Sequence, residues 1–484
     1  MPLLILDIGS SSVRALLFED DAQVINGSSI QRSHQFNVSE PGEATASAEQ
    51  LRSLLEQCID EVLTHPRTNE IRAVAAACFV GNMLGVAADY QPLTPLYTYA
   101  DSRSAASVQE LATKTDHAST LQRTGCRVHT AYHAPKLHWL KTTQPDLFNQ
   151  VNQWTDFVTY CMTHWFGRGV PCSYSVASWS GLLNREMLNW DEIWLSTLGL
   201  SREQFPTLAD VSDEQVGLSD AYAERWPILR EVPFLLPLGD GAAANIGSGA
   251  TSADTLALTI GTTAALRRIV TGKPPTVPDG LWAYRVTRDR HLVGGATTEG
   301  GNLYQWARST LNLPDDDAIE SALLAAEPGE HGLTLLPLLA GERSPGWWSQ
   351  ASGIVTGLRL GTSPVDILQA LMEAVAVQLA TIAEQLGEAQ RVYAGGGALH
   401  RSAAWSQMLA DALNVPLHLL ATPEVTARGV AMLALHVLDG HDLDEFPVPV
   451  KTVYQPRTDY REQWRTIRKA QQQLYNQMRG GYSG

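Results

Sequence analysis

The sequence is poor in cysteine and has none at the spacing of a thiolate metal site. Its 484 residues include five cysteines, an odd number, and no two of them form a C-x-x-C pair. This count disfavours both a disulfide framework and a thiolate zinc site. We expect most of the five to be small buried apolar residues. They are Cys58, Cys78, Cys126, Cys161 and Cys172.

Clusters of basic residues and long apolar runs are also missing. The formal net charge is -16, which disfavours a nucleic-acid or anionic-membrane surface, because counterion release at such a surface needs clustered Lys and Arg. The chain has no run of 18 apolar residues and no basic segment followed by an apolar one at its start. We therefore expect no signal peptide, no membrane span and a cytoplasmic protein.

Two common nucleotide-binding motifs are absent. No G-x-x-x-x-G-K-[ST] occurs, and GDGAAANIG (residues 239–247) does not match the dinucleotide fingerprint, so neither a Walker fold nor a Rossmann enzyme is supported. At 484 residues and 44% hydrophobic, the chain exceeds the size at which a single core stops growing. Two domains are the expected number.

A repeated segment opens each half of the chain. LLILDIGSSSVRAL (residues 3–16) aligns with TLALTIGTTAALRR (residues 255–268) at a constant offset of 252 residues. The alignment pairs Gly9 with Gly261 and a hydroxyl pair with a hydroxyl pair. Short strand-turn-strand pieces also resemble one another by chance, but the position of the copies predicts a duplicated α/β domain. The two loops would then face each other across a cleft.

The first loop has the composition of an anion cradle. Ser10 to Ser12 offer backbone N–H groups and hydroxyls, and Arg14 follows on the next predicted strand. A carboxylate at Asp7 would repel phosphate directly, so its sensible role is to hold hydrated Mg²⁺ that bridges the phosphates. The alternative is a plain turn with a capping aspartate.

A second aspartate lies between glycines near the middle of the chain. Asp240, in PLGDGAAANIGSGA, follows the apolar run VPFLLPL and precedes a small-residue helix. A strand would deliver this carboxylate to the edge of the cleft. Phosphoryl transfer to an alcohol needs such a group within hydrogen-bond reach of the attacking hydroxyl. An ordinary turn aspartate is the alternative.

The second half adds a glycine-rich turn and one strongly predicted helix. In YAGGGALHRSAAWSQMLADALNVPL a strand is expected to end at Ala394, and a helix to run to about Leu413. The three glycines would let the backbone approach a flat ligand, or form a flexible turn. A helix is predicted from an N-cap at Ser363, with Asp366 three residues later, to Gly387.

The order of these segments resembles the FGGY carbohydrate kinases over about residues 3–440. The motifs are strand-Asp-Gly-hydroxyls at the start, G-D-G and I-G-T-T near the middle, and G-G-G-A with W-x-Q-x-x-A-D in the last quarter. The resemblance implies an actin-like, ribonuclease-H-like α/β fold of two duplicated domains with mixed sheets around a nucleotide cleft. We place them at residues 1–248, mainly sugar-binding, and 249–484, nucleotide-binding. ATP and Mg²⁺ would occupy the cleft.

The same resemblance implies roles for individual residues. Asp240 would be the base, and Asp7 and Asp240 would be associated with the metal. The residues expected to contact ATP are Ser10, Ser11, Arg14, Gly261, Thr262, Thr263, Gly301, Gln305, Gly396, Gly397 and Arg401. Gly429 would help a helix approach the edge of the nucleotide.

The acceptor is harder to derive. Xylulose kinases of this family usually have a histidine where this chain has Leu84, whereas PLTPLYTYADSRS, TAYHAPKLHWL, SYSVASWSGLLN and GERSPGWW are similar to segments of gluconate kinases. Gluconate would need a cation, and Lys136, Arg103 and Arg343 are the candidates. Each has an ordinary alternative: Arg103 could pair with Asp101, Arg343 with Glu342, and Lys136 could start a helix. The predicted substrate-binding residues are Asn82, Met83, Asp101, Tyr132, Lys136 and Asp240.

The resemblance implies ATP-dependent phosphorylation of a sugar or sugar acid, with gluconate favoured and a pentulose such as xylulose or ribulose as the alternative. An actin-like or chaperone-type ATPase without a sugar acceptor shares the fold. It is disfavoured because the segment between Ala88 and Val232 is rich in Trp, Tyr, His and Asp, as a polyol pocket would be. The sequence leaves the oligomeric state open, with a homodimer as one possibility.

Overall fold

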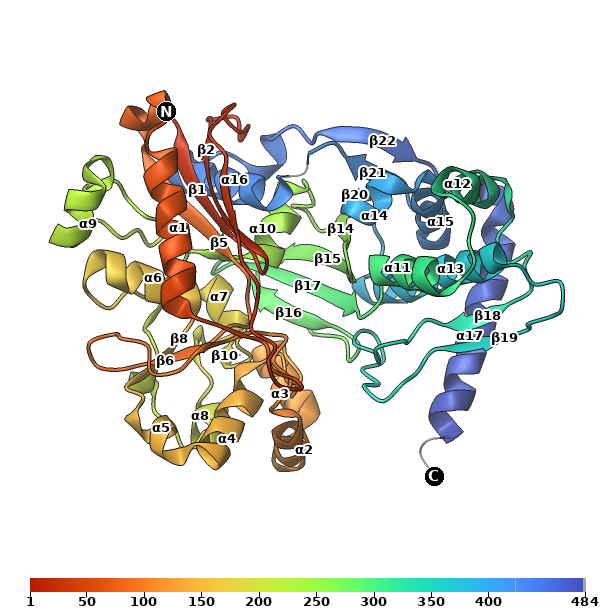
Figure 1. The fold of residues 1–484 in the computed structure, drawn as a ribbon, viewed down its shortest axis with the longest axis horizontal. Helices are drawn as coiled ribbons and strands as arrows, with labels where there is room; N and C mark the ends of the chain where they lie inside the picture. The colour runs from red at the N-terminus through yellow and green to blue at the C-terminus, as the bar shows by residue number, and fades with distance from the viewer. Residues whose placement is uncertain (423, 482–484) are drawn as a thin grey trace.

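The computed structural model describes residues 1–422 and 424–481 and contains one large sheet in each half of the chain (Figure 1). The first sheet has five strands in the order β13-β5-β1-β2-β3. They are β1 (Leu3–Ile8), β2 (Ser12–Phe18), β3 (Ile30–Ser33), β5 (Ala73–Cys78) and β13 (Leu238–Gly239). β1 is antiparallel to β2 and parallel to β5.

The second sheet has seven strands in the order β16-β17-β15-β14-β20-β21-β22. They are β14 (Thr255–Ile260), β15 (Ala264–Thr271), β16 (Trp282–Arg285), β17 (Arg290–Thr297), β20 (Arg391–Gly395), β21 (Leu417–Leu420) and β22 (Val450–Tyr454). Without its edge strands β16 and β22, this sheet repeats the first: an antiparallel meander is followed by two parallel strands. The predicted duplication is therefore confirmed.

A hydrogen bond from the glycine amide closes the first turn of each copy, but the two turns differ by one residue. The Gly9 amide donates to the carbonyl oxygen of Ser12, three residues later, at 2.9 Å, and the Gly261 amide donates to that of Thr263, two residues later, at 3.0 Å. Every residue of β1 is buried, because α1 (Ala48–Val62) packs on one side of this sheet and α16 (Val425–Asp439) on the other. A continuous apolar strand such as LLILDI is typical of a sheet covered on both faces.

A long insertion between β5 and β13 builds the lower part of the first half in Figure 1. Its helices are α2 (Ala105–Lys114), α3 (His117–Thr124), α4 (His133–Thr143), α5 (Pro145–Gln150), α6 (Phe157–Phe166), α7 (Tyr174–Ser178), α8 (Glu192–Leu198) and α9 (Asp220–Arg225). Short strand pairs join them, including β6 (Leu84–Val86) with β8 (Gln153–Thr155) and β9 (Cys172–Ser173) with β12 (Leu208–Ala209). The five cysteines are buried and unbridged, as expected.

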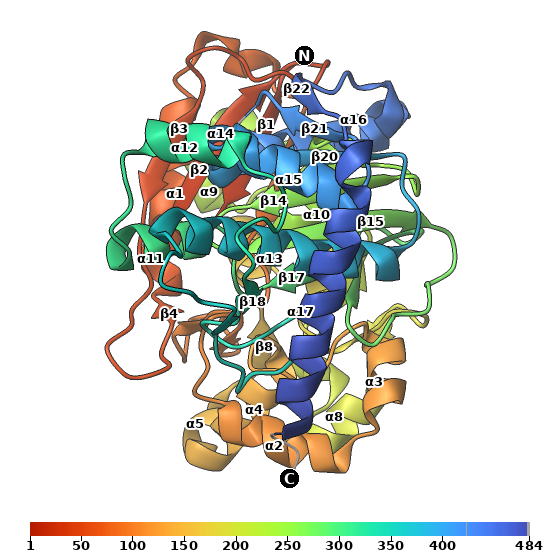
Figure 2. The ribbon, with the colours of Figure 1, turned by 90° about the vertical axis from the view of Figure 1, so that its right-hand side faces the viewer.

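The second half is covered by helices, and α17 runs along its outer side (Figure 2). They are α11 (Gly301–Thr310), α12 (Asp316–Ala325), α13 (Pro364–Leu386), α14 (Gly397–Arg401), α15 (Ala403–Leu413) and α17 (Arg461–Gly481). The predicted capping box is confirmed: the Asp366 amide donates to Ser363 Oγ at 3.1 Å, and the Ser363 amide donates to the Asp366 carboxylate at 2.8 Å.

Two predicted elements differ from the structure. The helix expected from the three glycines to Leu413 is broken at Ser402, whose side chain instead caps α15 by accepting a hydrogen bond from the Trp405 amide. The strand expected over VPFLLPL shortens to Leu238–Gly239, although Phe234 forms isolated bridges. Prolines at positions 233 and 237 limit this ladder, because proline has no N–H to donate.

Among residues 1–422 and 424–481, one helix, α13, has the length and composition of a membrane span. However, 78% of its most apolar window is buried inside the protein. It belongs to the core of the second half, with Leu371, Val375 and Leu379 among its buried residues. Its apolar surface is thus covered by the protein itself.

The two halves meet where α10 (Asp240–Gly247) crosses α16, between the two sheets in Figure 1. Glycines make this crossing close: a Cβ on Gly247 would lie 1.8 Å from the Val425 carbonyl oxygen, and one on Gly429 would lie 1.8 Å from that of Ala243. Gly429 thus brings α16 against α10, and its predicted role in bringing a helix to the edge of the nucleotide stays a prediction. A buried apolar cluster joins both halves here, and includes Ile5, Ile246 and Val430.

Candidate active site

A cavity of about 510 Å³ lies between the two halves. The first half contributes both the loop after β1 and the start of α10, and the second half contributes β14 to β17 and the segment between β18 (Thr334–Leu336) and β19 (Ile354–Thr356). Its lining includes Ser10, Tyr99, His129, Tyr132, Trp179, Asp240, Thr259, Thr263, Arg267, Tyr284 and Arg343. The duplicated elements therefore enclose one site.

The two repeated loops face this cavity together. Ser10 comes from the loop after β1 and Thr263 from the equivalent loop after β14, and both line its wall. Gly261 is exposed, and a Cβ there would meet no atom within 4 Å. The open space beside this loop leaves room for a ligand, and its backbone and hydroxyl groups can bind an anion.

Asp240 begins α10 directly after β13 and reaches the same cavity. Its carboxylate accepts a hydrogen bond from the Gly241 amide at 2.8 Å. Burial raises the pKa of Asp240 to about 6, although that amide and the charge of Arg267 act in the opposite direction; the nearby Asp7 raises it further. A carboxylate with a pKa near neutrality is suited to accept a proton.

Asp7 lies at the end of β1 and is almost fully buried. Arg14 forms ion pairs with Asp7 and with Glu424, at the start of α16. Burial raises the pKa of Asp7 and the Arg14 charge opposes this rise. Because Arg14 is already held by two carboxylates, its expected contact with the triphosphate stays a prediction.

Glycine-rich turns of the second half pack around the loop after β14. The Gly301 amide donates to the Gly261 carbonyl at 2.8 Å, and a Cβ on Gly396 would lie 2.2 Å from the Ile260 carbonyl oxygen. Gly396 also has φ +107°, which favours glycine. Arg401 lies beside Gly397. These residues surround the loop that is predicted to bind the nucleotide. Their contacts with ATP stay predictions, and so does the contact predicted for the exposed Gln305.

Aromatic residues from both halves form another part of the cavity. Tyr132, at the start of α4, and Tyr284, on β16, share a hydrogen bond of 2.7 Å between their hydroxyls. Trp179 stacks on Tyr284 with ring centroids 3.6 Å apart. The glycines on both sides of Asp240 accommodate this indole: a Cβ on Gly239 would lie 2.6 Å from Trp179 Nε1. Trp179 and Tyr284 were not predicted, although the two flanking glycines signal a close neighbour.

Four predicted substrate residues do not line this cavity. Asn82 donates to the Phe79 carbonyl and accepts from the Phe157 amide at 2.8 Å, and Met83 is fully buried. Asp101 is bound by Arg103, and Lys136 donates to the Thr130 carbonyl. Their polar groups are used within the protein, whereas their neighbours Gly81, Ala100, Thr130 and Tyr132 do line the cavity. In this structure the four support the cavity wall from behind.

The cations proposed to bind a substrate carboxylate also differ in whether they line the cavity. Arg103 forms the ion pair with Asp101 that the sequence offered as the alternative to substrate binding, and it also packs over the Trp139 ring. Arg343 does not pair with Glu342, which binds the Tyr475 hydroxyl at 2.6 Å; it lines the cavity instead. Arg267, on β15, lines it as well and was not predicted. Because side chains alternate along a strand, the segment AALRRIV predicts that Arg267 and Arg268 lie on opposite faces of the sheet. It does not predict which of the two faces borders the cleft.

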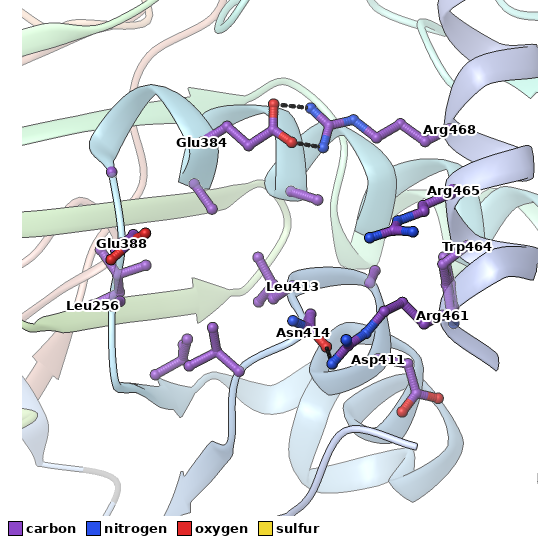
Figure 3. Close-up of a pocket in the computed structure, with 17 residues that line it drawn as sticks. Leu256, Glu384, Glu388, Asp411, Leu413, Asn414, Arg461, Trp464, Arg465 and Arg468 are labelled. Atoms are coloured by element: carbon purple, nitrogen blue, oxygen red, sulfur yellow. Dashed lines mark hydrogen bonds and ion pairs between the residues drawn. The ribbon is translucent and has the colours of Figure 1, made fainter. Parts of the chain in front are cut away.

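A second cavity, of about 610 Å³, lies between α13, α15 and α17 within the second half (Figure 3). Its arginines are occupied: Arg468 pairs with Glu384, as Figure 3 shows, and Arg461 donates to the Asn414 side chain at 3.0 Å. Arg465 pairs with Glu462. None of the predicted phosphate loops contributes to it, so the interdomain cavity is the better candidate site.

Known proteins resemble this chain over most of its length. The family model described as "FGGY family of carbohydrate kinases, N-terminal domain" matches residues 2–247, and the model of the C-terminal domain matches residues 256–438. A gluconokinase of Bacillus subtilis is 25% identical, covering 96% of this chain and 93% of its own length. A xylulose kinase of Escherichia coli is 26% identical, with 97% and 98% covered.

Solved structures share the whole architecture. A ligand-bound xylulose kinase from Lactobacillus acidophilus superposes with a TM-score of 0.93 at 24% identity, covering 100% of this chain and 99% of that one. A gluconate kinase from the same organism gives 0.92 at 24% identity, with 99% and 98% covered. A Plasmodium falciparum glycerol kinase with ADP gives 0.88 at 17% identity, with 98% of both chains covered. These matches establish the fold, and their titles name three different acceptors.

Proposed function

The chain belongs to the FGGY family of carbohydrate kinases, and from this premise we propose that it transfers the γ-phosphoryl group of ATP to a hydroxyl of a sugar acid, with gluconate as the acceptor and 6-phosphogluconate as the product. The observation that carries the proposal is the shared cavity: Ser10, Thr263 and Asp240 line it together, although they are far apart in the chain. Two loops with the composition of anion cradles and one carboxylate therefore share a cavity, which supports the proposal.

Asp240 is the proposed base. The acceptor hydroxyl attacks the γ-phosphorus, the new O–P bond forms as the bond to the β-phosphate oxygen breaks, and the hydroxyl proton passes to Asp240 while ADP leaves. Burial opposes ionisation of Asp240, whereas the Gly241 amide at the start of α10 and the charge of Arg267 favour it. The balance, a pKa of about 6, leaves the base mostly ionised at neutral pH.

The triphosphate is assigned to the two repeated loops. The backbone amides and hydroxyls at residues 10–12 and 261–263 can neutralise the charge that the transferring phosphoryl group develops. The glycines at 301, 396 and 397 border the nucleotide in this proposal. Use of an adenine nucleotide is supported by the glycerol kinase of the same fold, whose structure contains ADP. A cytoplasmic location belongs to the proposal too, and the five unbridged cysteines agree with it.

The residues present fit a magnesium ion. Asp7 and Asp240 are close enough that the charge of Asp7 raises the pKa of Asp240. Among residues 1–422 and 424–481, no group of three or more His, Cys, Asp or Glu forms a protein cage. Mg²⁺ typically takes one or two carboxylates and completes its shell with waters and substrate phosphates. When bound, it would neutralise phosphate charge; Arg14 holds Asp7 in place for it.

Contacts across the cavity favour a closed site. The Tyr132–Tyr284 hydrogen bond and the stack of Trp179 on Tyr284 join the insertion of the first half to β16 of the second. Such contacts keep water away from the γ-phosphate and limit wasteful hydrolysis.

A panel of acceptors tests the proposal. ADP release is measured by a coupled assay with ATP and Mg²⁺ and with gluconate, xylulose, ribulose, glycerol or no acceptor. We expect ADP release to depend on the acceptor and kcat/KM to be highest for gluconate. A clear preference for xylulose or ribulose would move the acceptor to the pentuloses and keep the reaction. Rapid ADP release without any acceptor would favour the ATPase alternative.

A further inference from the structure

The cavity holds two arginines that the protein itself leaves without strong partners. Among the described residues, the Arg343 side chain has no hydrogen bond or ion pair, and only its backbone carbonyl is used, by the Trp347 amide. Arg267 makes one long contact, from Nη1 to Thr259 Oγ1 at 3.4 Å, and its Nε is buried without a partner. Guanidinium groups carry five donors and are always charged. Two of them in one cavity therefore leave many donors for a ligand.

Their charges reinforce each other. Arg267 and Arg343 are near enough that Arg343 lowers the pKa of Arg267, together with the larger effect of burial. Asp240 offsets part of this, but no ion pair joins Asp240 to Arg267 within the described ranges. His129, on the facing wall, adds no charge at neutral pH, because burial and Arg343 lower its pKa to about 4. The cavity is therefore cationic beside the proposed base.

Other cations near this cavity are already satisfied, which sets these two apart. Arg103 is held by Asp101, Arg14 by Asp7 and Glu424, and Lys136 by the Thr130 carbonyl. The Arg267 Nε is buried without a partner, which is unfavourable, and an anion with matching geometry relieves that cost. Arg343 is half-buried, and its side chain can contact the same anion. A carboxylate accepts two parallel hydrogen bonds from a guanidinium group.

We propose that Arg267 and Arg343 bind the carboxylate of the acceptor and so select a sugar acid over neutral polyols and ketoses. This rests on the kinase function proposed above and adds the residues that determine specificity. Both arginines come from the second half, whereas Tyr99, His129 and Tyr132 line the cavity from the first. The acceptor would then be held between the halves, with one hydroxyl at Asp240 and its acid group at the arginines.

The sharpest probe pair is D-gluconate and D-glucitol, which differ at one carbon: a carboxylate in the first and a hydroxymethyl group in the second. Binding of each to the full chain without ATP is measured by titration calorimetry, and turnover by ADP release. Charged hydrogen bonds predict that gluconate binds the wild type about 10- to 100-fold more tightly than glucitol. Equal affinity for the two would overturn the proposal.

Arg267→Met and Arg343→Met test the residues, with Arg359→Met as a matched control whose exposed side chain lies outside the cavity. We expect each cavity variant to lower the gluconate-to-glucitol affinity ratio about 10-fold or more, and the control to keep the wild-type ratio. An unchanged ratio in both cavity variants would overturn the assignment. Equal losses of affinity for both probes would instead mean that the arginines contact the hydroxyls that gluconate and glucitol share, which contradicts the proposal.

Two further measurements keep the result decisive. Thermal unfolding of each variant identifies a folding defect. Arg267→Lys and Arg343→Lys retain the charge but lack the planar guanidinium group, so we expect them to recover part of the gluconate-to-glucitol affinity ratio. If gluconate binds through the arginines but no acceptor stimulates ADP release, the kinase proposal fails and the carboxylate site stands. If only neutral acceptors are phosphorylated, the kinase proposal stands and the carboxylate site fails.

Discussion

Gly429 of α16 lies directly against the carbonyl oxygen of Ala243 in α10, so that a Cβ on Gly429 would come within 1.8 Å of this oxygen. α16 belongs to the second half of the sequence, and α10 carries Asp240 at its first position. This contact therefore sets the place of the proposed base relative to both halves.

Gly429→Ala should damage stability and turnover together. The added methyl group has to push α16 away from α10, because the atom it meets is backbone. Overpacking of this kind costs about 1–3 kcal/mol or more. We expect a lower midpoint in chemical unfolding and a lower kcat as α10 shifts. Gly361→Ala, where a Cβ meets nothing within 4 Å, is the control; similar losses in both variants would mean that the helix crossing is not the cause.

Asp7→Asn should raise the Mg²⁺ concentration needed for half-maximal rate, by about 10-fold or more, because it removes one of two carboxylates assigned to the metal. Steady-state rates in a Mg²⁺ titration measure this. Glu424→Gln is the matched control, since it also breaks an ion pair of Arg14 but removes no assigned ligand. An unchanged Mg²⁺ requirement in Asp7→Asn would assign the residue to structure alone.

The rate should depend on pH through Asp240. Burial raises the pKa of this carboxyl to about 6, and only its ionised form can accept the hydroxyl proton. We expect kcat/KM for the acceptor to fall as pH drops below about 6 and to level off above about 7. A rate profile from about pH 5 to 8 measures this. A flat profile would contradict the assigned base.

The same shift predicts how Asp240 affects folding. Its pKa is higher in the folded state than the ordinary 3.8, so the folded protein holds this proton more tightly, and the contribution of Asp240 to stability falls as pH rises from about 4 to about 6. Asp240→Asn removes a charge that burial disfavours. At pH 7 we expect its unfolding midpoint to equal or exceed that of the wild type.

Elements specified by local chemistry were predictable from the sequence. The repeat of strand, glycine and hydroxyl pair led to two sheets of the same connectivity, because both copies bury the same apolar pattern. The Ser363–Asp366 capping box marked the start of α13 correctly, because capping depends on residues three apart. The prediction that Asp240 lies in the cleft also came from a local pattern, an apolar run followed by an aspartate between two glycines.

Side-chain direction was harder to predict. Asn82 directly follows the cavity residue Gly81, and Lys136 lies one helical turn after Tyr132, yet both side chains turn into the protein, where they form hydrogen bonds with other residues. Arg267 was missed because its place in the cavity depends on β15 packing against the other half. Trp179 was missed because its ring reaches the glycines on both sides of Asp240 only through the folding of the insertion. Such contacts between distant segments leave no local pattern.

The central claim is that the two repeated loops hold ATP beside a single proton-accepting carboxylate, and Asp240→Asn tests it most directly. Acceptor-dependent ADP release and ATP binding are measured on the same preparation of this variant. The account predicts that kcat falls by about 100- to 10,000-fold. The Kd for ATP, measured without Mg²⁺, should stay within about threefold of the wild type, since Asp240 is assigned to the acceptor and the metal and not to either loop. Near-normal turnover in Asp240→Asn would contradict it.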